Sequence, residues 1–109
     1  MTELPGGVKI ENWTNRTITL IAKDYGRTVD IPPEDDAPAM VTISHPHTEE
    51  EYIFTTEFLD SNLPDEEEGV YLIVTPVVKN AYPERHDLVL PICALRDKGV
   101  IVGYQGFSV

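Results

Sequence analysis

Two histidines and a run of glutamates form the pattern in this chain that most resembles a metal site. His45 and His47 flank Pro46, and three consecutive glutamates follow at positions 49–51. Imidazole and carboxylate groups bind zinc and other divalent ions, and a His-x-His pair on a strand places both rings on one face. The third histidine, His86, is distant in sequence, and no cysteine lies nearby. We therefore expect a solvated loop here and no metal site.

The acidic runs could also supply calcium ligands or a catalytic pair of carboxylates. Residues 65–68 lack the alternating ligand spacing and the central glycine of an EF-hand loop. A catalytic pair needs one carboxyl group in an apolar pocket that raises its pKa, whereas these acids stand in polar runs. The sequence contains no glycine-rich phosphate loop, no nucleophile elbow and no supported cysteine–histidine pair. It predicts no enzymatic activity, no catalytic residue and no cofactor.

The single cysteine, Cys93, lies in an apolar run at residues 88–95. With no second thiol, an intramolecular disulfide is excluded. A free cysteine in such a run behaves as a small hydrophobe, and only His86 is near enough in sequence to activate it. We expect Cys93 to be buried and unreactive.

The distribution of charge is the feature that points to a function. Residues 28–78 contain thirteen acids and no lysine or arginine, whereas the rest of the chain carries six acids and eight bases. The formal net charge of −11 therefore arises from −13 inside this window and +2 outside it. Such a distribution repels nucleic acid and anionic membrane and attracts basic protein surfaces.

The elements that must position these groups are short runs of β-branched and apolar residues. Strands are predicted at residues 8–11, 17–22, 27–31, 40–44, 70–75, 87–91, 100–103 and 105–109. A turn at residues 23–26 joins two of them into a hairpin, with Gly26 in a left-handed conformation. Pro32 and Pro33 end the strand before them, and Pro46 marks a break.

Residues 48–59 carry signals for two kinds of element. Thr48 and Glu51 fit a helix capping box, but the aromatic and β-branched run at residues 52–56 favours a strand, which we expect. A short helix is predicted at residues 76–82, because Pro76 suits a first turn and Pro83 stops the helix. The whole chain, residues 1–109, is predicted to be one mainly β domain, an antiparallel sandwich or a small, partly open barrel.

Several segments together resemble a family of small uncharacterised proteins of bacteriophages and prophages. The similarity is carried by the strand pattern at residues 12–20, the stop at residues 31–33, the apolar run at 69–74, Arg85, and the segments 87–91 and 96–103. The acidic inserts around residues 34–36 and 49–51 depart from the family's pattern. The resemblance implies a small β-rich domain of viral or mobile-element origin, and it implies no activity.

The first functional hypothesis is a non-enzymatic, phage-encoded inhibitor that acts as a DNA mimic. Carboxylates can imitate duplex DNA, which carries one negative charge per roughly 1.7 Å of axis. The expected partner is a basic nucleic-acid-binding protein of a bacterial host, such as a CRISPR effector or another defence complex, so the chain would be an anti-CRISPR-like protein. The expected partner-binding residues are Glu34, Asp35, Asp36, Glu49, Glu50, Glu51, Asp65, Glu66, Glu67 and Glu68.

Two other hypotheses remain open. The chain could be a virion or assembly protein that forms homo-oligomers edge to edge through apolar strands such as residues 100–102. It could also bind a signalling nucleotide, for which Arg16, Arg27, Arg85 and Arg96 are the available arginines. Two of these arginines have a structural alternative. We expect an ion network between strands that contains Arg85, Asp87, Arg96 and Asp97.

The sequence shows neither a signal peptide nor a membrane span, so we expect a cytoplasmic protein that binds neither membrane nor nucleic acid directly.

Overall fold

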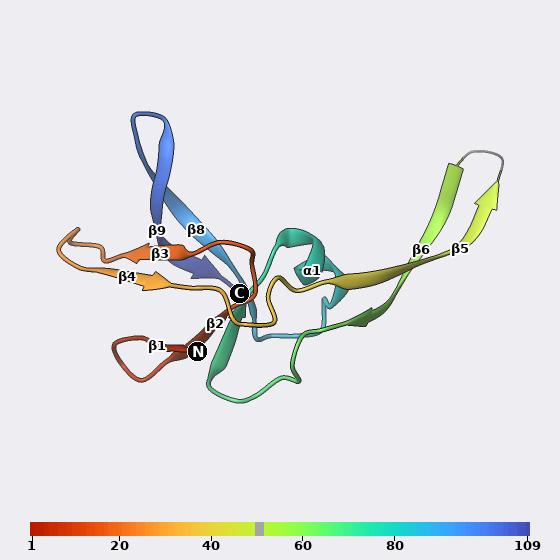
Figure 1. The fold of residues 1–109 in the computed structure, drawn as a ribbon, viewed down its shortest axis with the longest axis horizontal. Helices are drawn as coiled ribbons and strands as arrows, with labels where there is room; N and C mark the ends of the chain where they lie inside the picture. The colour runs from red at the N-terminus through yellow and green to blue at the C-terminus, as the bar shows by residue number, and fades with distance from the viewer. Residues whose placement is uncertain (50–51) are drawn as a thin grey trace.

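The computed structural model describes residues 1–49 and 52–109, and it describes residues 41–49 and 52–61 by their backbone alone. In this part of the chain the elements are β1 (Thr2–Glu3), β2 (Lys9–Asn12), β3 (Ile18–Ile21), β4 (Thr28–Ile31), β5 (Val41–Glu49), β6 (Tyr52–Ser61), β7 (Val70–Ile73), α1 (Pro76–Ala81), β8 (Leu88–Asp97) and β9 (Val100–Ser108). Figure 1 shows their arrangement. The helix and the predicted strands are therefore found, and the structure adds a short strand, β1, before the first predicted one.

Seven of the strands form a sheet in the order β1-β2-β7-β8-β9-β3-β4. It curls into a nearly closed barrel, so the partly open barrel is confirmed as the architecture. The sheet is nevertheless mixed, because β2–β7, β7–β8 and β3–β9 pair in parallel while the other three pairs are antiparallel. Sequence periodicity indicates that a segment is a strand but not which strand lies beside it, so the parallel pairs were not predictable from the runs alone.

The barrel has a seam between β4 and β2, and the seam is tied together at one end by Asn12. An isolated parallel bridge joins Asn12 to Pro33, and the amide of Glu34 donates to the Asn12 carbonyl at 2.9 Å. The Asn12 side chain adds a hydrogen bond from Nδ2 to the carbonyl of Ile31 at 2.8 Å. One buried residue therefore holds the end of β2 against the end of β4.

The core is split into two clusters because alternate residues of β7 and β8 point to opposite faces of the sheet. An inner cluster inside the barrel contains Ile10, Ile18, Ile31, Ile73 and Val89. An outer cluster on the other face contains Trp13, Val70, Leu72, Val74, Val78 and Leu88. Helix α1 covers the outer cluster with Val78, and its Pro76 occupies the start of the helix as expected. Among the described residues, no helix has the length and apolar character that crossing a bilayer requires.

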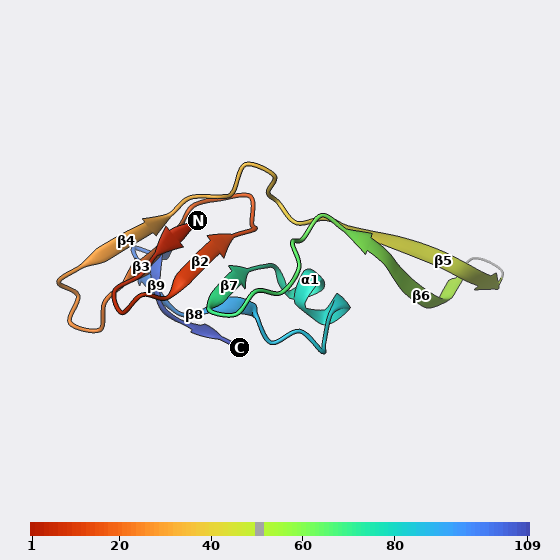
Figure 2. The same cartoon turned by 90° about the horizontal axis from the view of Figure 1, so that it is seen from below.

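Strands β5 and β6 form a two-stranded arm that projects from the barrel (Figures 1 and 2). They pair with each other in a sheet of their own, and the molecule as a whole measures 55 × 36 × 23 Å. Of the strand expected over residues 48–59, residues 52–59 lie in β6 and residues 48–49 end β5, while residues 50–51 lie outside the described residues. The break expected at Pro46 is instead a register shift between Ser44 and His47, because the chain continues as a strand past the proline.

Two local predictions are wrong. In the hairpin turn, Tyr25 adopts the positive φ of 60°, not Gly26, because the Gly26 amide is held at 2.8 Å by the Asp24 carboxylate. Cys93 is exposed and not buried, and its φ of 58° shows a local distortion of β8. The apolar run around Cys93 continues beyond the end of the inner cluster, so its residues face solvent.

Candidate functional site

The charge window in the sequence becomes one region of the molecule. Residues 34–68, which we call the acidic region, comprise the arm and the two loops that connect it to the barrel, and they carry twelve acids and no lysine or arginine. The remainder of the chain carries seven acids and eight bases, a net charge of +1. An almost neutral barrel thus carries a projecting region with a formal charge of −12.

Asn62 closes the base of the arm. Its Oδ1 accepts a hydrogen bond from the Met40 amide at 2.7 Å, and its Nδ2 donates to the carbonyls of Asp36 and Pro38 at 3.0 and 3.2 Å. These bonds join the loop before β5 to the residue after β6. One amide side chain therefore holds together the two chain segments at the base of the arm, a role that no motif in the sequence indicated.

The first acidic loop contains Glu34, Asp35 and Asp36. The Glu34 carboxylate is partly buried and lies 2.7 Å from the terminal amine of Met1, whereas Asp35 and Asp36 are exposed. The Ala37 amide donates to the Glu34 carbonyl at 3.0 Å, which forms a turn that presents the two aspartates outward. Two of the three predicted acids are thus available to a partner.

The second acidic loop, residues 65–68, is exposed throughout. The Val70 amide donates to the Glu67 carbonyl at 3.2 Å, and Gly69 takes a φ of 81° that lets the chain turn into β7. Glu66, Glu67 and Glu68 line a shallow pocket of about 210 Å³ with His86 and Asp87. All four acids remain free to face solvent or a partner.

Arg85 lies beside this loop but is already paired. Its Nε and Nη2 donate to the two oxygens of Asp87 at 2.9 and 2.6 Å, a two-pronged ion pair in which Asp87 is buried. The pKa of Arg85 is raised, first by its hydrogen bond to Asp87 and then by the nearby charges of Asp87, Glu66 and Asp65, against an opposing effect of burial. The expected pair is therefore present, but Arg96 instead donates to the Gly99 carbonyl at 3.3 Å, so the four residues do not form one network.

The third acidic group comprises residues 49–51. Glu49 is the last residue of β5, and its side chain lies outside the described part of the structure. Glu50 and Glu51 lie outside the described residues altogether. The side chains of His45 and His47 are likewise not described, so the metal-site alternative at these positions is not tested. Elsewhere in the described residues, no three His, Cys, Asp or Glu side chains gather in a way that could hold an ion.

The two described acidic loops, residues 34–36 and 65–68, do not lie side by side. Figure 2 shows the loops before and after the arm leaving its base on opposite sides, and the arm tip lies at the far end of the molecule. The structure therefore places charge around a projecting element instead of in one continuous row. A partner that contacts both loops has to reach around the base of the arm.

Comparison with family models, curated proteins and solved structures finds no match to this chain. The similarity to phage proteins rests on the residues quoted above and stays a prediction. The chemistry of the acidic region is thus the basis for assigning a function.

Proposed function

We propose that this protein is a non-enzymatic inhibitor that docks through its acidic region on the basic groove of a nucleic-acid-handling protein. The observation that supports the proposal most is the separation of charge between the acidic region, at −12, and the barrel, at +1. If acidity served solubility alone, acids would have no reason to concentrate on one projecting element. The segregation fits a surface that recognises a basic partner.

Such a surface has two physical advantages: it steers the protein towards a basic groove, and it competes there with nucleic acid. A region of one charge sign accelerates association with an oppositely charged groove, and it occupies the sites that phosphates would use. A thin two-stranded arm can enter a groove that a rounded barrel cannot, and the two acidic loops at its base would then contact the rim. Asp35, Asp36 and residues 65–68 are exposed in the free protein, so their contact with a groove needs no rearrangement of the barrel.

The class of partner follows from this chemistry and from the similarity to phage proteins. A basic groove that accepts many carboxylates is one built for the phosphates of nucleic acid. For a phage-encoded protein, the corresponding partner is a nuclease or a defence complex of the bacterial host, including CRISPR effectors. The protein acts there in the host cytoplasm.

The proposal is tested by capture of partners from bacterial lysate at low and high salt with matched charge variants. One variant carries D65N, E66Q, E67Q and E68Q, and a second carries E34Q, D35N and D36N. A control variant, E3Q/D30N/E84Q/D97N, removes as many charges as the first but from the barrel. We expect the wild type and the control to enrich one basic protein, more strongly at low salt than at high salt. We expect the two loop variants to lose this enrichment. Equal capture by all four proteins would show that the acidic loops do not contribute to partner binding.

A second candidate function, a homo-oligomeric assembly protein, is favoured by the far end of the β8–β9 hairpin. Val100, Ile101 and Val102 of β9 are exposed by 65%, 39% and 48%, which is unusual for three consecutive apolar residues. Strands β1 and β4 are also edges of the sheet. Light scattering distinguishes the two functions, because the inhibitor is expected at the monomer mass of 12.2 kDa and the assembly protein at a multiple of it.

A further inference from the structure

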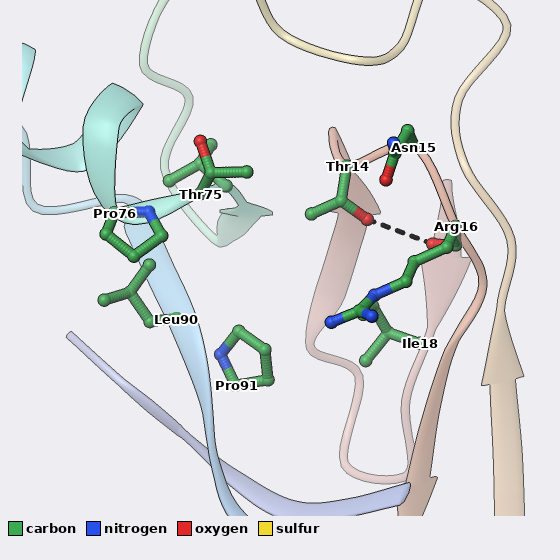
Figure 3. Close-up of a pocket in the computed structure, with 9 residues that line it drawn as sticks. Thr14, Asn15, Arg16, Ile18, Thr75, Pro76, Leu90 and Pro91 are labelled. Carbon is green, nitrogen blue, oxygen red and sulfur yellow. Dashed lines mark hydrogen bonds between the residues drawn. The ribbon is translucent and has the colours of Figure 1, made fainter. Parts of the chain in front are cut away.

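A cavity of about 280 Å³ opens on the barrel, outside the acidic region, where three segments meet (Figure 3). One wall is the turn after β2, residues 14–16, with Ile18 of β3. The opposite wall comprises the start of α1 and the first half of β8, and it presents Thr75, Pro76, Leu90 and Pro91. Figure 3 shows the Arg16 side chain reaching from the turn towards Leu90 and Pro91. The cavity thus combines an apolar wall with one positive charge.

Hydrogen bonds with buried side chains hold the turn that carries Arg16. Asn12 Nδ2 donates to the Arg16 carbonyl at 2.8 Å, and Thr14 Oγ1 lies 3.0 Å from the same carbonyl and 2.6 Å from Asn12 Oδ1. The Thr14 amide also donates to Asn12 Oδ1 at 2.9 Å. Asn12 is fully buried, so these bonds fix the backbone of Arg16 before any ligand arrives.

The guanidinium of Arg16 has no acidic partner among the described residues. Its contact there is with the Tyr104 hydroxyl, at 3.4 Å from Nη2. A second cavity of about 140 Å³, lined by residues 16–19 and 101–104, lies on the other side of Arg16. Neither cavity is lined by a carboxylate. Arg16 therefore lines both cavities with no carboxylate beside it to compete for an anionic ligand.

Further hydrogen-bonding groups line the same cavity. The Thr75 hydroxyl forms no capping hydrogen bond with α1, and Asn15, which is exposed, lies on the other wall. The Tyr104 hydroxyl lies 3.4 Å from Arg16 Nη2, on the side of the second cavity. A carboxylate has two oxygens, whereas a phosphate monoester has three terminal oxygens, so a two-pronged arginine contact leaves the third oxygen free to accept from another group.

We propose that this cavity binds a small organic phosphate, with the phosphate on Arg16 and the body of the ligand against Pro76, Leu90 and Pro91. The volume of the cavity is slightly below the range of roughly 300–1,000 Å³ for ligand pockets, which limits the ligand to about the size of a nucleoside monophosphate. The site contains no residue of the acidic region. The two proposals can therefore fail independently.

The test is nuclear magnetic resonance titration of the ¹⁵N-labelled full chain with adenosine 5′-monophosphate and with phenyl phosphate. Saturable shifts of the amides of Asn15, Arg16, Ile18 and Thr75 are expected with at least one of them at millimolar concentration. Adenosine and benzoate are the matched probes, and each should bind more weakly than its phosphate counterpart. Binding by benzoate that equals or exceeds that of phenyl phosphate would overturn the assignment to phosphates.

Variants separate the charge from the cavity. R16Q should weaken binding about tenfold, since it removes a charge-assisted hydrogen bond. R27Q removes an equally exposed arginine that lines neither cavity, and it should leave binding unchanged. T75F should fill the cavity and abolish binding while Arg16 keeps its charge. Undiminished binding in R16Q or T75F, or the absence of saturable shifts with both phosphates, would overturn the proposal.

Discussion

A single buried amide, Asn12, connects the barrel seam to the turn that carries Arg16. Its side chain forms hydrogen bonds with Thr14, Arg16 and Ile31, and its backbone forms an isolated β-bridge with Pro33. The sequence offered no signal for this role, because an asparagine at the end of a predicted strand reads as an ordinary turn residue. The partners of a buried polar group become known only when the fold brings distant segments together.

We expect Asn12→Ala to destabilise the protein by about 3 kcal/mol, because it leaves several buried donors and acceptors without partners. Asn12→Asp should be no better, since a carboxylate keeps the contact with the Thr14 amide but cannot donate to the carbonyls of Arg16 and Ile31. Urea unfolding measures both changes. Loss of less than about 1 kcal/mol in both variants would show that the seam does not depend on this residue.

Gly103 allows β9 to approach β3 closely. A Cβ atom at this position would lie 2.5 Å from Cδ1 of Ile21 and 3.0 Å from the Thr19 carbonyl. Gly103→Ala should therefore destabilise the protein by about 1–3 kcal/mol, and adding Ile21→Val should recover part of that loss by removing Cδ1. Gly106→Ala is the control, because its Cβ would meet Ile92 at an ordinary 3.6 Å. Equal thermal stability of the two glycine variants would contradict the close packing.

Arg85 is expected to stabilise the barrel by compensating the buried charge of Asp87. Arg85→Gln should cost about 2–3 kcal/mol, and adding Asp87→Asn should restore part of it, because the second change removes the unpaired charge. The raised pKa of Arg85 means that its contribution is complete below the unfolded-state pKa and is lost only as pH rises through the folded-state value. The difference between wild type and Arg85→Gln should thus be constant from neutral pH to moderately alkaline pH, as measured by denaturant titration.

Among the elements, the arm differs most from the rest of the fold. Strands β5 and β6 pair with each other, and their base is closed by Asn62, so the barrel does not need them for its own sheet. The aromatic and β-branched residues of this segment predicted a strand correctly. Sequence runs do not reveal that this strand pairs in a sheet separate from the barrel, or that Pro46 lies inside a strand with a register shift at residues 44–47.

Replacing residues 42–60 by an Asn-Gly turn should leave the barrel folded, because such a turn suits a tight hairpin and the base of the arm is retained. The unfolding midpoint should shift by no more than a few degrees. The radius of gyration, 16.2 Å over Cα atoms, should fall towards the value of about 13 Å typical of a compact chain of this length. Small-angle scattering and calorimetry measure the two quantities. Unfolding of the shortened chain would show that the arm is part of the cooperative unit.

At the scale of the whole molecule, the sequence predicted the charge imbalance and the mainly β barrel, but not their relation in space. The acidic loops at residues 34–36 and 65–68 both flank the arm, but they lie on opposite sides of its base. The uneven distribution of charge along the sequence gives one projecting acidic region, because the arm and its two loops are a single continuous segment that leaves the barrel and returns to it. This geometry implies enclosure by a groove instead of contact with a flat surface.

The most direct test of the central claim is competition between this protein and nucleic acid for the partner captured from lysate. Binding of the partner to its labelled nucleic acid should fall as the protein is added, and rising salt should weaken this inhibition because the contact is between charges. Neutralising residues 65–68 should reduce both the inhibition and its salt dependence, while E3Q/D30N/E84Q/D97N should inhibit as the wild type does. Nucleic acid and protein bound to the partner at the same time, without competition, would contradict the account.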